Sequence, residues 1–167
     1  QQSTKVYRVG YLWPTRQEQG QSRFDVFKLG MHDHGYEVGK NLSIESRFAD
    51  GKSDRLPGLA ADLVRLNVDV IVTGVNPGVV AAKQASSTIP IVMTAGNDPI
   101  GTGLVASLAR PGGNVTGLSM DTGEENFGKR LELMQESLSR LARVAVLFNS
   151  GNAAHQIYLK SLEQPAR

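Results

Sequence analysis

Short runs rich in Val, Ile and Leu alternate along this chain with longer segments of helical hydrophobic spacing, and this alternation constrains the fold more than any other feature. Consecutive parallel strands need crossover connections, which are usually helices, and these helices cover both faces of the sheet. The pattern therefore predicts an α/β fold with a doubly wound parallel sheet. The predicted strands are Val6–Leu12, Leu42–Phe48, Val68–Thr73, Ile89–Met93, Val115–Leu118 and Val144–Phe148.

Two of the connecting segments are predicted helices in the first half of the chain. Apolar residues follow Leu56 at the i+3, i+4, i+7 and i+8 positions of one helix face, with Asp54 as a candidate cap and Pro57 in the first turn. The segment from about Arg23 to Gly35 is less regular, and it ends on a glycine that favours a left-handed cap.

Two further helices are predicted later in the chain. Asn76-Pro77-Gly78 favours a helix start, because Asn can cap and Pro is preset for the first helical position, and this helix should run to about Ser86. The other has apolar residues at spacings of three and four, namely Phe127, Leu131, Met134, Leu138 and Leu141.

The order of elements also predicts where the chain divides. A turn at 110–114 precedes the fifth predicted strand, and a new run of helix, strand and helix follows it. We therefore predict a boundary near Ser119–Gly123, with residues 1–120 as an N-terminal ligand-binding lobe and 121–167 as the start of a second lobe. One helix, one strand and a terminal helix are too little to close an independent sheet.

Composition excludes several classes of protein. Lys and Arg exceed Asp and Glu by only 18 to 16 and are scattered, so nucleic acid is not an expected partner. The chain has no cysteine, which excludes disulfides and thiol chemistry, and it has no apolar run long enough to span a membrane. A polar start directly before a strand is what a secreted protein would show after signal-peptide removal, and equally what a trimmed cytosolic chain would show.

Ligands bind open parallel sheets at the carboxyl ends of the strands, so the loops after the strands are the candidate site. These loops are built of small, polar and turn residues. They are Leu12–Thr15 after the first strand, Gly74–Gly78 after the third, and Thr94–Pro99 after the fourth.

Three residues in these loops have both a functional and a structural interpretation. The helix start at Asn76 would present free backbone N–H groups and a positive dipole end to a carboxylate, or Asn76 would simply cap a helix. Asp98 would receive the ammonium of an amino acid or cap a turn begun by Pro99. Trp13, the only tryptophan, would stack on a flat ligand or cover the edge of the core.

Catalytic, metal and nucleotide chemistry have no support in the sequence. His32 and His34 point to different faces of a helix, no third metal ligand accompanies them, and a solvated helix end is the favoured interpretation. Gly101-Thr102-Gly103 lacks the continuation of a nucleotide-binding loop. The sequence offers no Ser, His and Asp that could serve together as nucleophile, base and orienting acid. We therefore predict that the chain is not an enzyme and binds neither a metal nor a cofactor.

Several segments of the sequence resemble one protein family. The resemblance covers nearly the whole chain and is most specific in the long stretch that precedes and enters the fifth predicted strand. The segments are Arg8–Leu12, Gly35–Tyr36, Gly39–Leu42, Ile89–Val92, Asp98–Pro99, Gly103–Val105 and Ser107–Gly117. The chain thereby resembles ABC-transporter substrate-binding proteins related to tryptophan and tyrosine transport binding proteins, with a type I periplasmic-binding fold.

The resemblance implies a protein of about twice this length, in which two lobes close over an amino acid or related acid, aromatic ones among them. The implied partners are this ligand and a membrane permease of the transporter, and the implied location is periplasmic or extracellular. The ligand-binding residues are then expected at Leu12, Trp13, Asn76, Pro77, Gly78, Asn97 and Asp98, with Asn149 from the second lobe.

Other interpretations remain open at this point. The same fold serves as a ligand-sensing module of regulators or receptors, and a small α/β enzyme is the third alternative. Because a single lobe buries only part of a ligand, we expect weak or no binding by this chain alone. Exposed apolar surface on the incomplete second lobe also favours a homodimer formed through the C-terminal segment.

Overall fold

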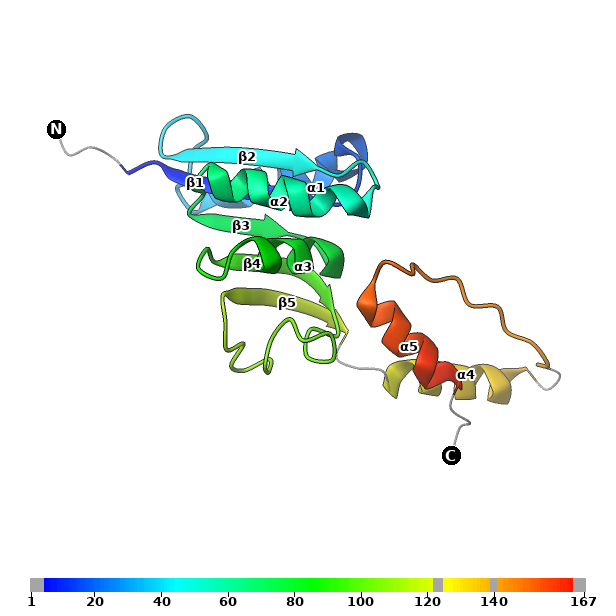
Figure 1. The fold of residues 1–167 in the computed structure, drawn as a ribbon. Coiled ribbons are helices and arrows are strands. Elements are labelled where there is room, and N and C mark those ends of the chain that lie inside the picture. Colours follow the sequence, from blue (N-terminus) through cyan, green and yellow to red (C-terminus); the bar gives the residue numbers. More distant parts are fainter. Residues whose placement is uncertain (1–4, 122–124, 139–140, 164–167) are drawn as a thin grey trace.

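The computed structural model describes residues 5–121, 125–138 and 141–163, in which strands and helices alternate as predicted (Figure 1). The strands are β1 (Tyr7–Trp13), β2 (Leu42–Phe48), β3 (Val70–Thr73), β4 (Ile91–Asn97) and β5 (Val115–Asp121). The helices are α1 (Gln17–Asp33), α2 (Leu56–Arg65), α3 (Val75–Ala85), α4 (Glu125–Ser137) and α5 (Ala153–Glu163), and the short 3-10 helix η1 (Ser53–Arg55) precedes α2.

The five strands form one parallel sheet in the order β2-β1-β3-β4-β5. This arrangement confirms the predicted α/β class. The strand order reverses at β1, because β2 is added on one side of it and β3 on the other. At such a switch point the loops after the two neighbouring strands run in opposite directions and leave a crevice at the carboxyl edge, where ligands bind in folds of this kind.

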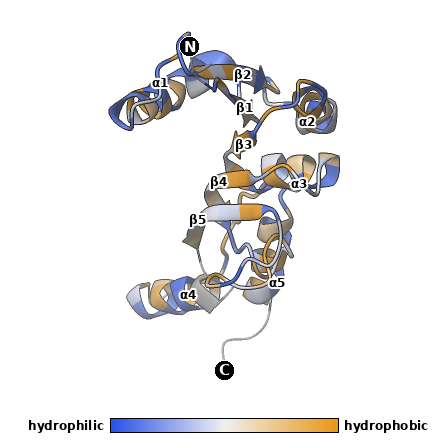
Figure 2. Cartoon of the chain, turned by 90° about the vertical axis from the view of Figure 1, so that its left-hand side faces the viewer, coloured by the Kyte–Doolittle hydropathy of each residue, from blue (hydrophilic) through white to orange (hydrophobic). Residues whose placement is uncertain are grey.

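Helices cover both faces of the sheet, and each face has its own core (Figure 2). Alternate residues of a strand point to opposite faces. In β1, Leu12 therefore packs with α2 and α3, whereas Tyr11 and Trp13 pack with the aromatic side chains of α1. Figure 2 looks along the strands and shows α1 on one side of the sheet and α2 and α3 on the other.

Helix α1 begins at Gln17, earlier than the predicted start at Arg23. Its first turns are polar, so hydrophobic spacing gave no signal for them. They pack closely all the same, because a methyl group added at Gly20 would lie 3.2 Å from the Trp13 ring and 3.1 Å from Phe48. The predicted C-terminal cap is confirmed, since Gly35 has φ +83°. His32 and His34 lie exposed at this helix end, as predicted.

The predicted strand Val144–Phe148 is wrong, because the structure has an irregular extended segment there. A strand is stable only where a neighbour completes its backbone hydrogen bonds, and no other described strand lies beside this segment. Its apolar side chains are exposed, and Leu147 is fully so. The segment is apolar, as a strand would be, but its sequence does not show whether another strand lies beside it to pair with it.

Three local predictions also need correction. Strand β4 continues to Asn97 rather than ending at Met93, with irregular pairing to β5 around Gly96. Asp54 caps no helix, because it lies inside η1 and neither η1 nor α2 has a side-chain cap. Asn76 is not the cap of α3, because Gly74 occupies that position and Asn76 lies inside the first turn.

Helices α4 and α5 lie beyond the carboxyl edge of the sheet and contact each other (Figure 1). Phe127 and Tyr158 stack between them with ring centroids 4.1 Å apart. Of the predicted boundary, Ser119–Asp121 belongs to β5, while residues 122–124 lie outside the described residues. The helical positions predicted from Phe127 onward are confirmed as far as Ser137.

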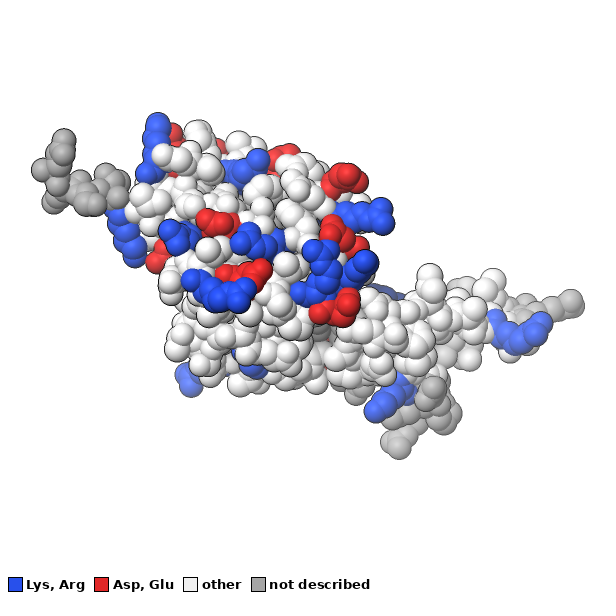
Figure 3. All heavy atoms as spheres, turned by 45° about the horizontal axis from the view of Figure 1, so that its top comes forward, with Lys and Arg blue, Asp and Glu red and all other residues white. Residues whose placement is uncertain are grey.

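Charged side chains of both signs are interspersed on the face that carries α2 (Figure 3). Several form ion pairs with close neighbours in the sequence, as Asp50 does with Arg55 and Asp62 with Arg65. Exposed pairs of this kind contribute little to stability. Among the described residues, no helix has the length and apolarity needed to cross a membrane.

Candidate functional site

A cavity of about 750 Å³ opens at the carboxyl edge of the sheet, on the face covered by α1. The segments after β1 and β3 contribute to it, so it lies at the switch point of the strand order. Its lining is mostly apolar, as in small-molecule sites. The lining residues are Tyr11, Trp13, Pro14, Thr15, Ser22, Arg23, Val26, Phe27, Val72, Gly74, Val75, Thr94, Ala95 and Met120.

Trp13 forms the wall of the cavity at the end of β1. Its indole stacks on the ring of Tyr11, with centroids 5.2 Å apart and planes 7° apart, and only 7% of the residue is exposed. Gly74 lies against the six-membered ring of the indole, since an added methyl group would come within 2.9 Å of it. Trp13 therefore has a fixed position: it covers the edge of the core, as one of the two interpretations predicts, and it also lines the cavity. Stacking of the indole on a ligand stays a prediction.

Helix α1 also contributes a wall of the cavity, although no residue of α1 was predicted to be in the site. Ser22, Arg23, Val26 and Phe27 line the cavity at the one- and four-residue spacings of one helix face. Phe27 also packs on Tyr11, with centroids 5.6 Å apart. A helix pattern alone could not show this role, because it depends on how α1 crosses β1.

The connection from β3 to α3 brings backbone to the cavity. Val75 has φ +50°, a left-handed conformation that β-branched residues rarely adopt and that costs about 1–3 kcal/mol. The first amide groups of a helix have no acceptor within it, and the first turn of α3 contains no acidic residue. The positive end of the α3 dipole therefore lies at this edge of the cavity, where Gly74 and Val75 line it.

Asn76 joins two elements that border the site. Its side chain is 1% exposed, donates from Nδ2 to the carbonyl oxygen of Asn97 (2.7 Å) and accepts at Oδ1 from the amide nitrogen of Asn97 (2.9 Å). The amide group of Asn76 thereby fixes the start of α3 against the end of β4. Asn76 does not line the cavity, and the predicted ligand contact by its side chain stays a prediction.

Residues at the ends of β4 and β5 complete the cavity. Thr94 and Ala95 come from β4, and the Thr94 hydroxyl donates to the carbonyl oxygen of Thr73 over 3.4 Å. Met120 comes from β5 and is 77% exposed, so this end of the cavity is open. The predicted loop after the fourth strand, 94–99, thus contributes to the site, but the contributing residues belong to β4 itself.

Asp98 caps a turn, which is one of the two roles predicted for it; the other was to bind the ammonium group of an amino acid. Its carboxylate accepts a hydrogen bond from the Gly101 amide (3.0 Å), and its carbonyl oxygen accepts one from the Thr102 hydroxyl (2.7 Å). The residue is 6% exposed and lies outside the cavity lining. Its carboxylate therefore caps the turn that Pro99 begins.

The other predicted ligand residues lie away from this cavity. Leu12 is buried on the opposite face of the sheet, and Gly78 packs against the Thr73 hydroxyl. Pro77 lies between Asn76 and Gly78 in the first turn of α3. Asn149 is exposed and its side chain accepts a hydrogen bond from the Gly151 amide (2.9 Å). Ligand contact at these positions stays a prediction.

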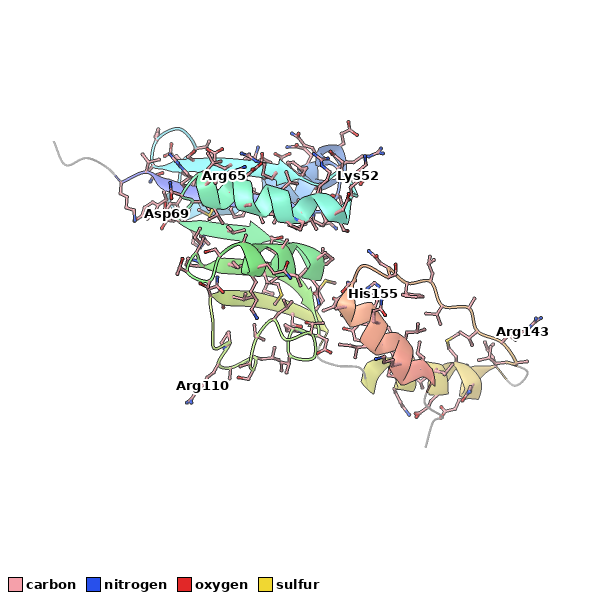
Figure 4. All side chains as sticks on the ribbon, viewed as in Figure 1. Lys52, Arg65, Asp69, Arg110, Arg143 and His155 are labelled. Carbon is pink, nitrogen blue, oxygen red and sulfur yellow. The ribbon has the colours of Figure 1, made fainter. Side chains whose placement is uncertain are left out.

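A second, smaller cavity of about 140 Å³ lies between the end of β4 and the C-terminal helices. Asn97 lines it together with apolar residues of α4, α5 and the segment before α5. His155 also borders it, in the first turn of α5 (Figure 4). Asn97, one of the predicted ligand residues, thus borders this cavity and not the larger one.

Burial raises the pKa of Tyr11 to about 12, despite the nearby charge of Arg23, which lowers it. The unfolded chain loses this phenol proton near the ordinary tyrosine pKa of 10.0, so between pH 10 and 12 it binds fewer protons than the folded chain. Stability is therefore expected to fall as pH rises through this range. Between about pH 9 and 11, the free energy of unfolding of the Tyr11→Phe variant should fall by about 1 kcal/mol less than that of the wild type, as measured by urea unfolding. Equal losses would contradict this assignment.

The sequence of this chain is similar to that of a known protein family. Residues 20–167 match the family model described as ABC transporter substrate binding protein. The chain is 33% identical over 141 residues to the tyrosine-binding protein of Clostridioides difficile, an alignment that covers 84% of this chain and 40% of that protein.

Solved structures show the same fold. A conserved domain protein from Vibrio cholerae superposes with a TM-score of 0.80 at 32% identity, covering 95% of this chain and 53% of that one. An ABC domain from Streptococcus pneumoniae, solved with L-Trp, superposes with a TM-score of 0.79 at 23% identity, covering 97% and 54%. The chain thus spans about half the length of these structures.

Proposed function

The chain belongs to the ABC transporter substrate-binding protein family, and we propose that it forms the ligand-capturing lobe of an extracytoplasmic binding component of an importer. Its ligand is an amino acid or a related small acid with an aromatic body. It captures this ligand without changing its covalent structure and presents it to a membrane permease.

The cavity at the carboxyl edge is the observation that carries this proposal. Its volume of about 750 Å³ suits a small molecule, and its position at the strand-order switch point is where this class of sheet binds ligands. Its walls are built mainly from aromatic and aliphatic side chains, with a few hydroxyl groups and one guanidinium group between them.

An aromatic ligand is supported by the walls and by one relative. Tyr11, Trp13 and Phe27 surround the cavity, and aromatic rings pack favourably on such surfaces. The similar protein from Clostridioides difficile is named for binding tyrosine. These two observations together favour an aromatic acid over an aliphatic one.

Closure of two lobes over the ligand is the second part of the proposal. The chain spans about half of each solved relative, and the cavity is open beside Met120. We propose that residues 1–120 form the first lobe, that residues from 121 onward begin the second, and that the hinge lies near Ser119–Gly123. A partner lobe would cover the open side of the cavity and exclude water from the ligand.

A thermal-shift screen tests the proposed function. A ligand that binds only the folded state stabilises it by RT ln(1 + [L]/Kd), which is about 1.4 kcal/mol when the ligand is at ten times Kd. L-phenylalanine and L-tyrosine at millimolar concentrations should therefore raise the Tm of the chain by about 2–6 °C, whereas glucose should not. Stabilisation by L-leucine and L-valine but by neither aromatic amino acid would overturn the aromatic assignment. Because this lobe alone contains the cavity, the expectation of weak or no binding narrows to weak binding, and stabilisation by no acid at all would overturn the proposed function.

A further inference from the structure

Arg23 is the one charged residue among the described residues that line the large cavity. It belongs to α1, one turn before Phe27, and its positive charge acts on the hydroxyl of Tyr11. The rest of the lining is apolar or carries hydroxyl groups, and none of it is Asp or Glu. The one charged side chain that lines the cavity is therefore positive.

The Arg23 guanidinium has no ion-pair partner within 4.0 Å among the described residues. The acid nearest to it along α1 is Asp25, and this carboxylate is held by Lys28 at 2.8 Å and by Gln21 at 2.9 Å. Hydrogen bonds from Lys28 and Gln21 keep the pKa of Asp25 below its usual value. Asp25 is thus paired with Lys28, and the guanidinium of Arg23 is available to bind a ligand.

Resting on the proposed function, we infer that Arg23 binds the carboxylate of the ligand and that this lobe selects aromatic monocarboxylates whether or not they carry an amino group. A guanidinium offers several N–H donors in a fixed plane that matches the two oxygens of a carboxylate. Ser22 and Thr15 line the same cavity with hydroxyl groups, and the start of α3 adds its positive end.

The same lining gives an ammonium group no acidic partner. Asp98, the residue that the sequence suggested for this purpose, lies outside the cavity and caps its own turn. Removing the amino group from a ligand should therefore change its affinity for this lobe little. Removing the carboxylate should leave an amine facing Arg23, which is repulsive.

Three ligands with one phenyl ring test the inference by calorimetric or NMR titration of the chain. L-phenylalanine carries both charged groups, 3-phenylpropionate carries only the carboxylate, and phenethylamine carries only the ammonium group. The wild type should bind the first two within about threefold of each other and phenethylamine at least about tenfold more weakly. Arg23→Gln should weaken binding of the two carboxylates about three- to tenfold and leave phenethylamine unchanged or slightly improved.

Arg110→Gln is the matched control, because Arg110 is exposed and lies at the opposite edge of the sheet (Figure 4). It should bind all three ligands as the wild type does. If Arg23→Gln binds 3-phenylpropionate as tightly as the wild type, the inference is wrong and the proposed function stands. If phenethylamine binds as well as 3-phenylpropionate, charge selection is likewise refuted. If none of the three ligands binds, the proposed function and this inference both fail.

Discussion

Replacing Gly117 with alanine is expected to destabilise the chain by at least about 3 kcal/mol, a large part of the stability of a typical domain. Gly117 pairs with Met93 between β5 and β4 and has φ +137°, a conformation that side chains rarely adopt. An added methyl group would overlap the carbonyl oxygen of Met93 and lie 2.7 Å from its carbonyl carbon and 2.8 Å from its nitrogen. Backbone atoms in a sheet cannot move aside without breaking the pairing.

Gly113→Ala provides the control for this variant. Gly113 precedes β5 in the same stretch, and an added methyl group there would meet nothing within 4 Å. Its stability should stay within about 0.5 kcal/mol of the wild type. Urea unfolding followed by circular dichroism measures both variants. A Gly117→Ala midpoint equal to that of Gly113→Ala would show that the two strands do not approach so closely.

Replacing Asn76 with leucine is expected to cost about 2–4 kcal/mol. The substitution removes both hydrogen bonds to the Asn97 backbone and leaves its N–H and carbonyl groups without this partner. It also frees the start of α3 from the end of β4, so ligand binding should weaken together with stability. A simple ligand contact at Asn76 would instead weaken binding and leave stability unchanged.

Gln84→Leu is the matched control on the same helix, because Gln84 is an exposed residue of α3. Its free energy of unfolding should change by less than about 0.5 kcal/mol. Urea unfolding and ligand titration of the two variants separate the alternatives. Equal stability of Asn76→Leu and Gln84→Leu would contradict the structural role of Asn76.

The fold was largely predictable from hydrophobic spacing. Five of the predicted strands exist, and the inner strands β1 and β3 are mostly buried, as apolar runs in a parallel sheet are expected to be. The run at Val144–Phe148 has the same composition but pairs with no described strand. Strand formation depends on a neighbour as well as on propensity, and a neighbour is not visible in a single segment.

The location of the site was predictable, but most of its residues were not. Parallel strands place their carboxyl ends at one edge, which directed attention to the loops at 12–15, 74–78 and 94–99, and each of these ranges contributes to the cavity. The alternation of side chains decides which residue of a loop faces a ligand. It turns Trp13 toward α1 and Leu12 into the opposite core.

Two further features required the packing of helices against the sheet. Arg23 lies in a segment with weak hydrophobic spacing, so the sequence gave no reason to place it beside Tyr11. Asn76 was predicted to cap α3 because Asn can cap and a proline follows it, yet Gly74 takes the cap position. A residue with a side chain at Gly74 would collide with the Trp13 ring. Arg23 stands among mostly polar residues in the sequence, in the segment Gln21–Asp25, so its place beside the cavity becomes visible only once α1 is packed on the sheet.

The indole N–H resonance of Trp13 offers the most direct test of the claim that this cavity binds a small aromatic acid. The chain has a single tryptophan, so its ¹H–¹⁵N spectrum contains one indole signal, and that side chain is a wall of the cavity. Titration with L-phenylalanine should move this signal saturably, together with the backbone amides of Thr15, Val75 and Ala95. An unmoved indole signal under conditions where L-phenylalanine raises the Tm would place the binding site elsewhere and contradict the account.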